Sequence, residues 1–311
     1  MNIVFMGTPE FAVPSLLQML KNGYNVAGVV TQPDRPKGRK RELAPPPVKI
    51  AALEAGLPVM QPERLRHPDA VAELAKWRPD LIVTAAYGQI LPKTVLDMPP
   101  LGCINVHASL LPKYRGGAPI HHAIMNGERV TGVTIMYMAE GLDTGDIISK
   151  VEVPIGDDDN VGTMFEKLAH AGAELLIETL PKIMSGQAER VPQDESQATY
   201  APNITREQER IDWNRTAVQL FNQVRGMNPW PVAHTIWNGE VLKIWECRAA
   251  SEEKAAGRPG EVLSVKPTGI DVACGSGVLT ITRLQPAGKK AMDAADFVRG
   301  GKLQEGTVFG S

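Results

Sequence analysis

The sequence has few cysteines and few aromatic residues, and it has no long apolar run. Its three cysteines, Cys103, Cys247 and Cys274, lie far apart and form no Cys-x-x-Cys pair. This spacing argues against a structural zinc site or a disulfide framework and fits the reducing cytoplasm. No stretch reaches the roughly 18 apolar residues of a membrane-spanning helix, and the start MNIVFMGTPEF lacks the form of a secretory signal. These absences predict a soluble cytoplasmic protein with no membrane partner.

The common nucleotide-binding fingerprints are also missing, although the chain begins as they do. An apolar run at 2–6 is followed by Gly7-Thr8-Pro9, and apolar residues then recur at helical spacing up to Leu20. This turn holds one glycine and a proline, so it is not GxGxxG, and the sequence has no GxxxxGK[ST]. An ordinary NAD or ATP site is therefore not expected.

The composition is that of an ordinary globular protein. The 311 residues are 43% apolar and 22% charged, which allows two domains with their own cores. The net charge of −2 does not mark the whole chain as a polyanion binder. A local basic patch could still bind phosphates, because that attraction depends on where the charges lie.

Strands alternate with helices along residues 1–189. Apolar runs predict strands at 2–6, 24–31, 58–60, 80–86, 103–107, 129–138 and 146–153, with helices between them and over 161–185. This alternation predicts an α/β domain, with a Rossmann-like, mostly parallel sheet and helices on both faces. Ligands of such sheets gather at the carboxyl ends of the strands.

A second domain is expected after a polar linker that contains prolines, residues 190–206. The part over 207–311 begins with a helix at 214–225, and short β-like runs follow. Asn238-Gly239 between two of these runs predicts a hairpin. Short strands at this spacing predict a small β-barrel.

The stretch from Leu101 to Pro119 carries the main chemical signal. Asn105 and His107 lie two residues apart on a predicted strand, so their side chains project from one face. An imidazole can accept the proton of an attacking amine, and an amide N–H can donate to an oxyanion, as acyl transfer requires. The alternative is a polar strand end with a structural histidine.

Asp143, in the turn Glu140–Asp146, is the second candidate. It is either a turn aspartate or a carboxylate that orients His107 and assists proton transfer. Two further histidines, His121 and His122, fall on a predicted helix over 118–125, where packing or surface roles are favoured.

The proline-rich loop over 32–49 is basic. It contains Arg35, Lys37, Arg39, Lys40, Arg41 and Lys49 against Asp34 and Glu42. The loop is either a solvated charged surface or, since it leaves the carboxyl end of a strand, an element that orders on a phosphate backbone.

At these residues the chain resembles the methionyl-tRNA formyltransferases, within the folate-dependent formyltransferase superfamily. The resemblance runs end to end through Gly7-Thr8-Pro9-Glu10-Phe11, the basic loop, Ala86–Leu91, Asn105–Pro112, Tyr114–Pro119, Gly141–Asp146 and Asn228-Pro229-Trp230-Pro231. The Asn…His…SLLPxYRG…GLDTGD series marks the superfamily. The basic loop and the NPWP-containing second part narrow it to the tRNA enzymes.

The resemblance implies a formyl transfer from 10-formyltetrahydrofolate to the α-amino group of methionyl initiator tRNA, with no metal. It places Asn105, His107 and Asp143 at the catalytic positions and implies an OB-like second domain that binds tRNA with Arg35, Lys37, Arg39, Lys40 and Arg41. It also implies a monomer. The residues it assigns to the folate pocket are Tyr87, Gly88, Gln89, Ile90, Leu91, Ser109, Leu110, Leu111, Pro112, Ala139, Glu140, Gly141 and Leu142.

Two alternatives remain open from the sequence. One is a folate-dependent formyltransferase that acts on a small amine, such as a nucleotide-linked amino sugar or glycinamide ribonucleotide. The other is a catalytically silent RNA-binding protein that kept the fold. The first would share the Asn, His and Asp residues but would not need the basic loop.

Overall fold

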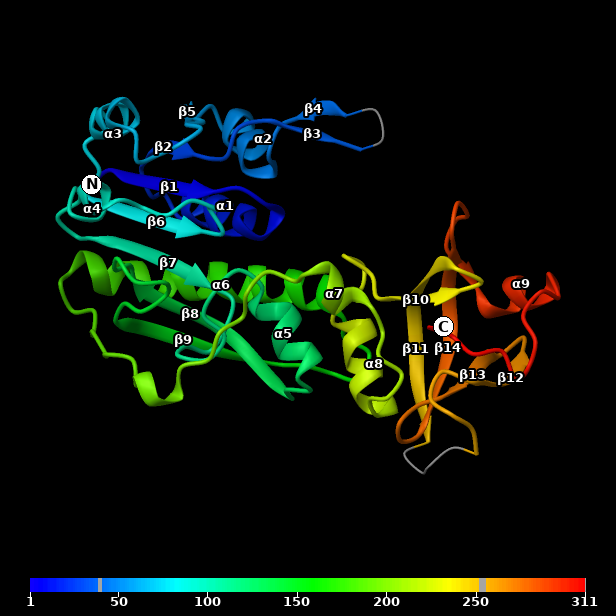
Figure 1. Cartoon of the computed structure of the whole chain (residues 1–311). Coiled ribbons are helices and arrows are strands. Elements are labelled where there is room, and N and C mark those ends of the chain that lie inside the picture. Colours follow the sequence, from blue (N-terminus) through cyan, green and yellow to red (C-terminus); the bar gives the residue numbers. More distant parts are fainter. Residues whose placement is uncertain (39–40, 252–255, 311) are drawn as a thin grey trace. The chain divides into compact units, whose positions relative to one another are not determined.

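A computed structural model describes residues 1–38, 41–251 and 256–310 (Figure 1). The chain forms two compact units. The first comprises Met1–Gly116, Val130–Pro154 and Phe165–Ala201, and the second comprises Gly117–Arg129, Ile155–Met164 and Pro202–Ser311. Two segments that precede residue 190 therefore group with the C-terminal part of the chain. The linker predicted over 190–206 stays a proposal, and its last five residues belong to the second unit.

The first unit is built on a seven-stranded sheet in the order β5-β2-β1-β6-β7-β8-β9 (Figure 1). Neighbouring strands from β5 to β7 pair in parallel, whereas β8 is antiparallel to both β7 and β9. A mostly parallel sheet is thus confirmed. The strand bounds are β1 Ile3–Gly7, β2 Val26–Val30, β5 Val59–Met60, β6 Leu81–Ala85, β7 Cys103–His107, β8 Val130–Tyr137 and β9 Ile147–Pro154.

Helices cover both faces of this sheet, as the apolar pattern predicts. Leu74 of α3 (Pro68–Ala75) and Val95 of α4 (Lys93–Leu96) share a core cluster with Val4 of β1. Gly172 of α6 (Val161–Met184) lies on the opposite face, where a Cβ atom would come within 2.9 Å of Val106 of β7. Alternation along β7 places Val106 on the side away from Cys103, which belongs to the first cluster. The remaining helices of this unit are η1 Glu10–Ala12, α1 Val13–Lys21, α2 Pro47–Glu54 and η2 Glu195–Gln197.

The basic loop contains a small hairpin that the sequence analysis does not foresee. Strands β3 (Arg35–Lys37) and β4 (Glu42–Ala44) pair antiparallel, with Lys37 opposite Glu42. The residues of β3 are exposed, so the hairpin buries no face and leaves no alternating apolar pattern in the sequence. Arg39 and Lys40, two of the predicted tRNA-binding residues, lie outside the described residues.

The second unit contains an antiparallel sheet in the order β10-β11-β14-β13-β12, with β15 paired to β14. This confirms a C-terminal antiparallel β domain. Asn238 and Gly239 form the predicted hairpin turn, with φ values of 52° and 75°. The strands are β10 His234–Trp237, β11 Glu240–Ser251, β12 Val262–Lys266, β13 Gly269–Ala273, β14 Val278–Pro286 and β15 Met292–Asp293, and the helices are α5 Pro119–Met125, α7 Arg206–Glu209, α8 Ala217–Arg225 and α9 Ala294–Arg299.

Helix α8 begins three residues later than the apolar pattern predicts. The Thr216 side chain accepts a hydrogen bond from the Gln219 backbone N–H, and the Gln219 side chain accepts one from the Thr216 backbone N–H. This capping box fixes the first turn at Ala217. The preceding Asn214 instead binds the Asp212 carboxylate, which holds that residue in a turn.

The segment 306–310 joins the two edges of the antiparallel sheet. The Thr307 carbonyl accepts from the N–H of Val262 in β12, the Gly306 N–H donates to the Val262 carbonyl, and the Phe309 N–H donates to the Gly260 carbonyl, each at 2.8 Å. Next to them, the Gly310 N–H donates to the Ile236 carbonyl of β10 at 2.9 Å. The Phe309 ring also packs on Trp213, with ring centroids 6.0 Å apart. The backbone groups of both edges are thus partly satisfied by one segment.

Candidate functional site

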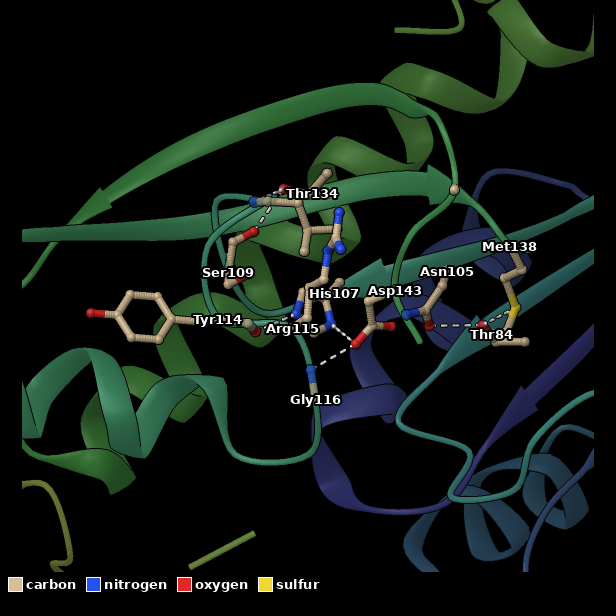
Figure 2. Close-up of polar contacts among 12 residues, drawn as sticks. Thr84, Asn105, His107, Ser109, Tyr114, Arg115, Gly116, Thr134, Met138 and Asp143 are labelled. Atoms are coloured by element: carbon tan, nitrogen blue, oxygen red, sulfur yellow. Dashed lines mark hydrogen bonds and ion pairs between the residues drawn. The ribbon is translucent and has the colours of Figure 1, made fainter. Parts of the chain in front are cut away.

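Asn105 and His107 project from one face at the carboxyl end of β7 (Figure 2). Their neighbours follow from the register of the sheet. Thr84 of β6 lies opposite Asn105, and Thr134 of β8 lies opposite His107. The site therefore sits where the parallel part of the sheet meets its antiparallel edge.

The Asn105 amide is oriented by a hydroxyl group. Thr84 Oγ1 donates to Asn105 Oδ1 at 2.7 Å, and it also lies 3.1 Å from the Ile104 carbonyl. An amide whose oxygen accepts from one side presents its N–H donors on the other. Figure 2 shows the Asn105 oxygen on the Thr84 side and the nitrogen on the side of Asp143. The amide is therefore set as a hydrogen-bond donor at the site.

His107 is buried, and one of its ring nitrogens is occupied. Nε2 lies 3.0 Å from the Tyr114 carbonyl oxygen. A carbonyl can only accept, so Nε2 carries the hydrogen in this contact and Nδ1 of the neutral ring is left as an acceptor. Nδ1 lies 3.7 Å from Asp143 Oδ2. The nitrogen that can take a proton is thus the one that faces the carboxylate.

Asp143 reaches the site from the turn between β8 and β9. Its Oδ2 accepts a hydrogen bond from the Gly116 N–H at 2.8 Å. The Asp143 backbone is left-handed, with a φ of 51°, a conformation that aspartate tolerates better than most residues. Two residues on, a Cβ atom at Gly145 would lie 1.7 Å from the Tyr137 carbonyl oxygen, so only glycine allows this close approach. The turn thus brings the three predicted catalytic residues together.

The loop after His107, predicted to bind folate through residues 109–112, is tied to β8 and β9. Thr134 Oγ1 donates to the Ser109 carbonyl at 2.7 Å and accepts from the Leu111 N–H at 3.1 Å. The Ser109 hydroxyl donates to the Lys113 carbonyl at 2.6 Å. Lys150 Nζ donates to the Leu111 carbonyl, and burial lowers the pKa of this amine. The Leu111–Pro112 peptide bond is cis.

The other predicted folate residues differ widely in exposure. Tyr87 and Leu91 are buried in the core cluster of α3 and α4, whereas the Ile90 and Leu142 side chains are 85% and 60% exposed. The Gln89 amide holds the backbone of residues 62–65. Only part of this set therefore presents side chains to a ligand, and its role in folate binding stays a prediction.

A cavity of about 290 Å³ lies beside the Asp143 turn. Among the predicted folate residues, Ala139 and Glu140 line it; the other lining residues are Lys93, Leu96, Asp97, Gly102, Cys103, Tyr137, Met138 and Arg190. Burial raises the pKa of the Cys103 thiol to about 12. This cysteine is therefore a neutral thiol at physiological pH and not a nucleophile.

The described basic residues of the hairpin are exposed, and one of them has a partner. Arg35 forms an ion pair with Glu63 at 3.0 Å, in which both side chains are more than half exposed. Asp34, at the base of the hairpin, binds Gln61 and Lys49, and these hydrogen bonds lower the pKa of its carboxyl group. Lys37 and Arg41 lie at the surface. The hairpin thus presents positive charge from an anchored base.

His121 and His122 are packing residues of the second unit. The His121 ring meets the Trp230 ring edge-on, with centroids 6.3 Å apart, and burial lowers its pKa. His122 Nε2 lies 2.9 Å from the Pro202 carbonyl. These contacts agree with the packing interpretation of the two histidines.

Within residues 1–38, 41–251 and 256–310, no cluster of three or more His, Cys, Asp or Glu side chains could hold a metal ion. None of the helices in that part of the chain is long and apolar enough to cross a membrane.

Sequence reasoning missed the residues that orient the site. Thr84 could have been found, because the predicted parallel pairing of the strands at 80–86 and 103–107 places it near Asn105. Gln193, whose amide binds the backbone of the Asp143 turn, falls in the predicted linker and gives no signal in the sequence. Arg115 lies inside the motif Tyr114–Pro119, but no separate role was predicted for it.

The arrangement suits acyl transfer to an amine. It offers an amide donor, an imidazole with a free nitrogen and a carboxylate that can stabilise the protonated ring. The three groups come from β7 and from the turn after β8, and the loop over 109–112 borders them.

Comparison with known proteins identifies both parts of the chain. The model of a family described as formyl transferase matches residues 1–180, and that of the formyl transferase C-terminal domain matches residues 203–302. Two curated relatives are methionyl-tRNA formyltransferases. The relative from Bacillus subtilis is 58% identical over 309 residues, which cover 99% of this chain and 97% of the relative. The relative from Bacillus velezensis is 58% identical over 310 residues, with the same coverage.

A solved structure shares the fold. It is an N-formyltransferase from Helicobacter canadensis in complex with folinic acid and dTDP-3-aminofucose. The TM-score is 0.65 at 20% identity, and the match covers 90% of this chain and 97% of that one. At this identity the likeness concerns the fold alone.

Proposed function

Since the chain belongs to the formyl transferase family, we propose that it transfers a formyl group from 10-formyltetrahydrofolate to the α-amino group of methionyl initiator tRNA. The observation that carries this proposal is the end-to-end similarity to curated methionyl-tRNA formyltransferases. The transfer serves translation initiation in the cytoplasm. The folate is a substrate that leaves after each turnover.

The chemistry assigns a role to each of the three site residues. The amine nitrogen attacks the formyl carbon, and an N–C bond forms while the carbonyl oxygen becomes an oxyanion. The Asn105 amide donates to this oxyanion. His107 Nδ1 accepts the proton that the amine loses, and Asp143 stabilises the imidazolium. The bond from the formyl carbon to folate N10 then breaks, and N10 takes up a proton.

Different parts of the chain would bind the two substrates. The loop over 109–112, the segment 87–91 and the turn over 139–142 would hold the folate. The tRNA backbone would contact the basic hairpin, including Arg39 and Lys40, and the C-terminal antiparallel domain. Binding both substrates at one site supplies the proximity that a reaction between two large molecules needs.

A formylation assay tests this proposal. Wild-type protein is given 10-formyltetrahydrofolate and either methionyl initiator tRNA or a nucleotide-linked amino sugar. We expect formyl transfer to the tRNA only. The variant His107→Ala should lose a factor of about 10² to 10⁴ in kcat, while His122→Ala, which removes a packing histidine, should retain activity.

Each contrary outcome points to a different error. Preference for the amino sugar would identify a small-amine formyltransferase. Equal rates for wild type and His107→Ala would refute the catalytic assignment. Binding of tRNA without any formylation would favour a silent RNA-binding protein.

A further inference from the structure

The segment 191–201 folds against the residues that border the site. At one end, Val191 and Ile147 of β9 exchange two backbone hydrogen bonds of 2.8 and 2.9 Å. At the other end, the Arg115 N–H donates to the Thr199 carbonyl at 2.9 Å, and the Ala201 N–H donates to the Arg115 carbonyl at 2.6 Å. The segment is therefore fixed on both sides of Gln193 and Glu195.

Gln193 links two parts of the site with one amide. Its Nε2 donates to the carbonyl oxygens of Asp143 and Gly145, at 2.7 and 2.8 Å. Its Oε1 accepts from Nε and Nη2 of Arg115, at 3.1 and 2.8 Å. Both donors and the acceptor of the side chain are thus used.

Arg115 is held firmly enough to serve as the anchor of this link. Its side chain is fully buried, and it forms a two-point ion pair with Glu195 at 2.7 and 2.9 Å. The Glu195 carboxylate raises the pKa of the Arg115 guanidinium. A buried guanidinium keeps its position only if its donors are satisfied, and Gln193 and Glu195 together accept four hydrogen bonds from it.

Gln193 thereby binds next to both partners of the hydrogen bond that holds the predicted catalytic carboxylate of Asp143. Gly116, which follows Arg115, donates its N–H to Asp143 Oδ2. Asp143 itself holds a left-handed backbone, and Gln193 binds the carbonyl oxygen of that residue. The amide thus joins the donor side and the acceptor side of the Gly116–Asp143 hydrogen bond.

We propose that Gln193 is a positioning residue, whose amide fixes the Asp143 carboxylate against the Gly116 N–H and His107. The expected loss of kcat rests on the proposed function, whereas the expected change at the Gly116–Asp143 hydrogen bond rests on the geometry alone. Loss of the amide frees the turn over 143–145, and the carboxylate moves away from the imidazole. A displacement of about 1 Å at a reacting group can cost up to about a hundredfold in rate.

Two variants separate the functions of the amide. Gln193→Ala removes all four hydrogen bonds. Gln193→Glu keeps an acceptor for Arg115 but loses the donors to Asp143 and Gly145. Gln197→Ala is the matched control, because Gln197 lies exposed in the same segment and its side-chain amide donates to the Asp194 carboxylate at 2.8 Å.

The first measurement is steady-state formylation of methionyl-tRNA. We expect kcat to fall between about tenfold and a hundredfold in Gln193→Ala and Gln193→Glu, with the KM values of tRNA and folate nearly unchanged. Gln197→Ala should match the wild type. A kcat loss confined to Gln193→Ala would mean that the contact to Arg115, and not the donors to the turn, matters, and it would overturn the proposal.

The second measurement does not depend on activity. Hydrogen exchange of the Gly116 amide, followed by NMR, reports directly on its bond to Asp143. Asp143→Ala gives the exchange rate without the carboxylate, and both Gln193 variants should move toward that rate while residues of the remote α1 helix keep theirs. An unchanged Gly116 rate in both variants would overturn the proposal. Wild-type protein that fails to formylate the tRNA would instead refute the proposed function and leave the Gly116 result to decide the inference.

Discussion

Thr84 Oγ1 lies 2.7 Å from Asn105 Oδ1, across the parallel pair of β6 and β7. Thr84 is buried and Asn105 is half-buried, so this contact is partly sheltered from water. The hydroxyl turns the amide so that its nitrogen, and not its oxygen, serves the site. An oxyanion gains from a donor and is repelled by a carbonyl oxygen, so the orientation of Asn105 matters for the proposed reaction.

Removal of the Thr84 hydroxyl should therefore lower the rate. Thr84→Val keeps the branched shape and deletes the donor, which leaves Asn105 Oδ1 without this partner. We expect kcat to fall about tenfold or more, which is less than the roughly hundredfold or greater loss on removal of an oxyanion donor itself. The measurement is steady-state formylation with saturating folate. Thr84→Ser, which retains the hydroxyl, should recover most of the activity, and equal losses in both variants would contradict this role.

The exposed charges of the hairpin should govern tRNA affinity. The double variant Lys37→Ala and Arg41→Ala removes two exposed positive charges of the hairpin and leaves the contacts of Asp34 at its base unchanged. We expect weaker tRNA binding and a salt dependence whose log–log slope falls by about one for each phosphate that the protein no longer neutralises, with the KM of folate unchanged. Fluorescence titration at several salt concentrations measures this. Lys76→Ala, at the exposed residue that follows α3, is the control, and equal effects from it would argue for a diffuse charge effect.

The second unit should lose stability as the pH falls through the range of histidine titration. Burial lowers the pKa of His121 below its ordinary value of 6.5. The unfolded chain then binds this proton more readily than the folded chain, so the free energy of unfolding falls as the pH drops below 6.5 and levels off below the folded pKa.

His121→Phe removes this titration and keeps a ring against Trp230. Urea unfolding of wild type and variant between about pH 5 and pH 8 checks the sign. The wild type should lose more stability toward acid than the variant. Parallel curves would show that His121 does not contribute.

Much of the fold follows from periodicity in the sequence. The inner parallel strands β1, β2 and β6 are nearly continuous apolar runs because both faces of the sheet are covered by helices. Successive side chains of a strand point to opposite faces, and this two-residue period predicted that Asn105 and His107 share a face. The hairpin of β3 and β4 was not predicted, because an exposed strand pair leaves no apolar pattern in the sequence.

The site was predictable only in part. The position of Asp143 next to His107 depends on a left-handed turn and on the Gly116 N–H, and neither is visible in a local pattern. Gln193 lies 50 residues beyond Asp143 in a polar stretch that reads as a linker. Its role arises from tertiary contacts alone.

The segment 306–310 binds both edges of the antiparallel sheet, so the two edges should open together. It forms backbone hydrogen bonds with Gly260 and Val262 at one edge and with Ile236 at the other. When the segment detaches, both edges are exposed in the same event. The amides of Val262, Phe309 and Gly310 should therefore exchange with one common opening free energy, as a single cooperative unit of local unfolding.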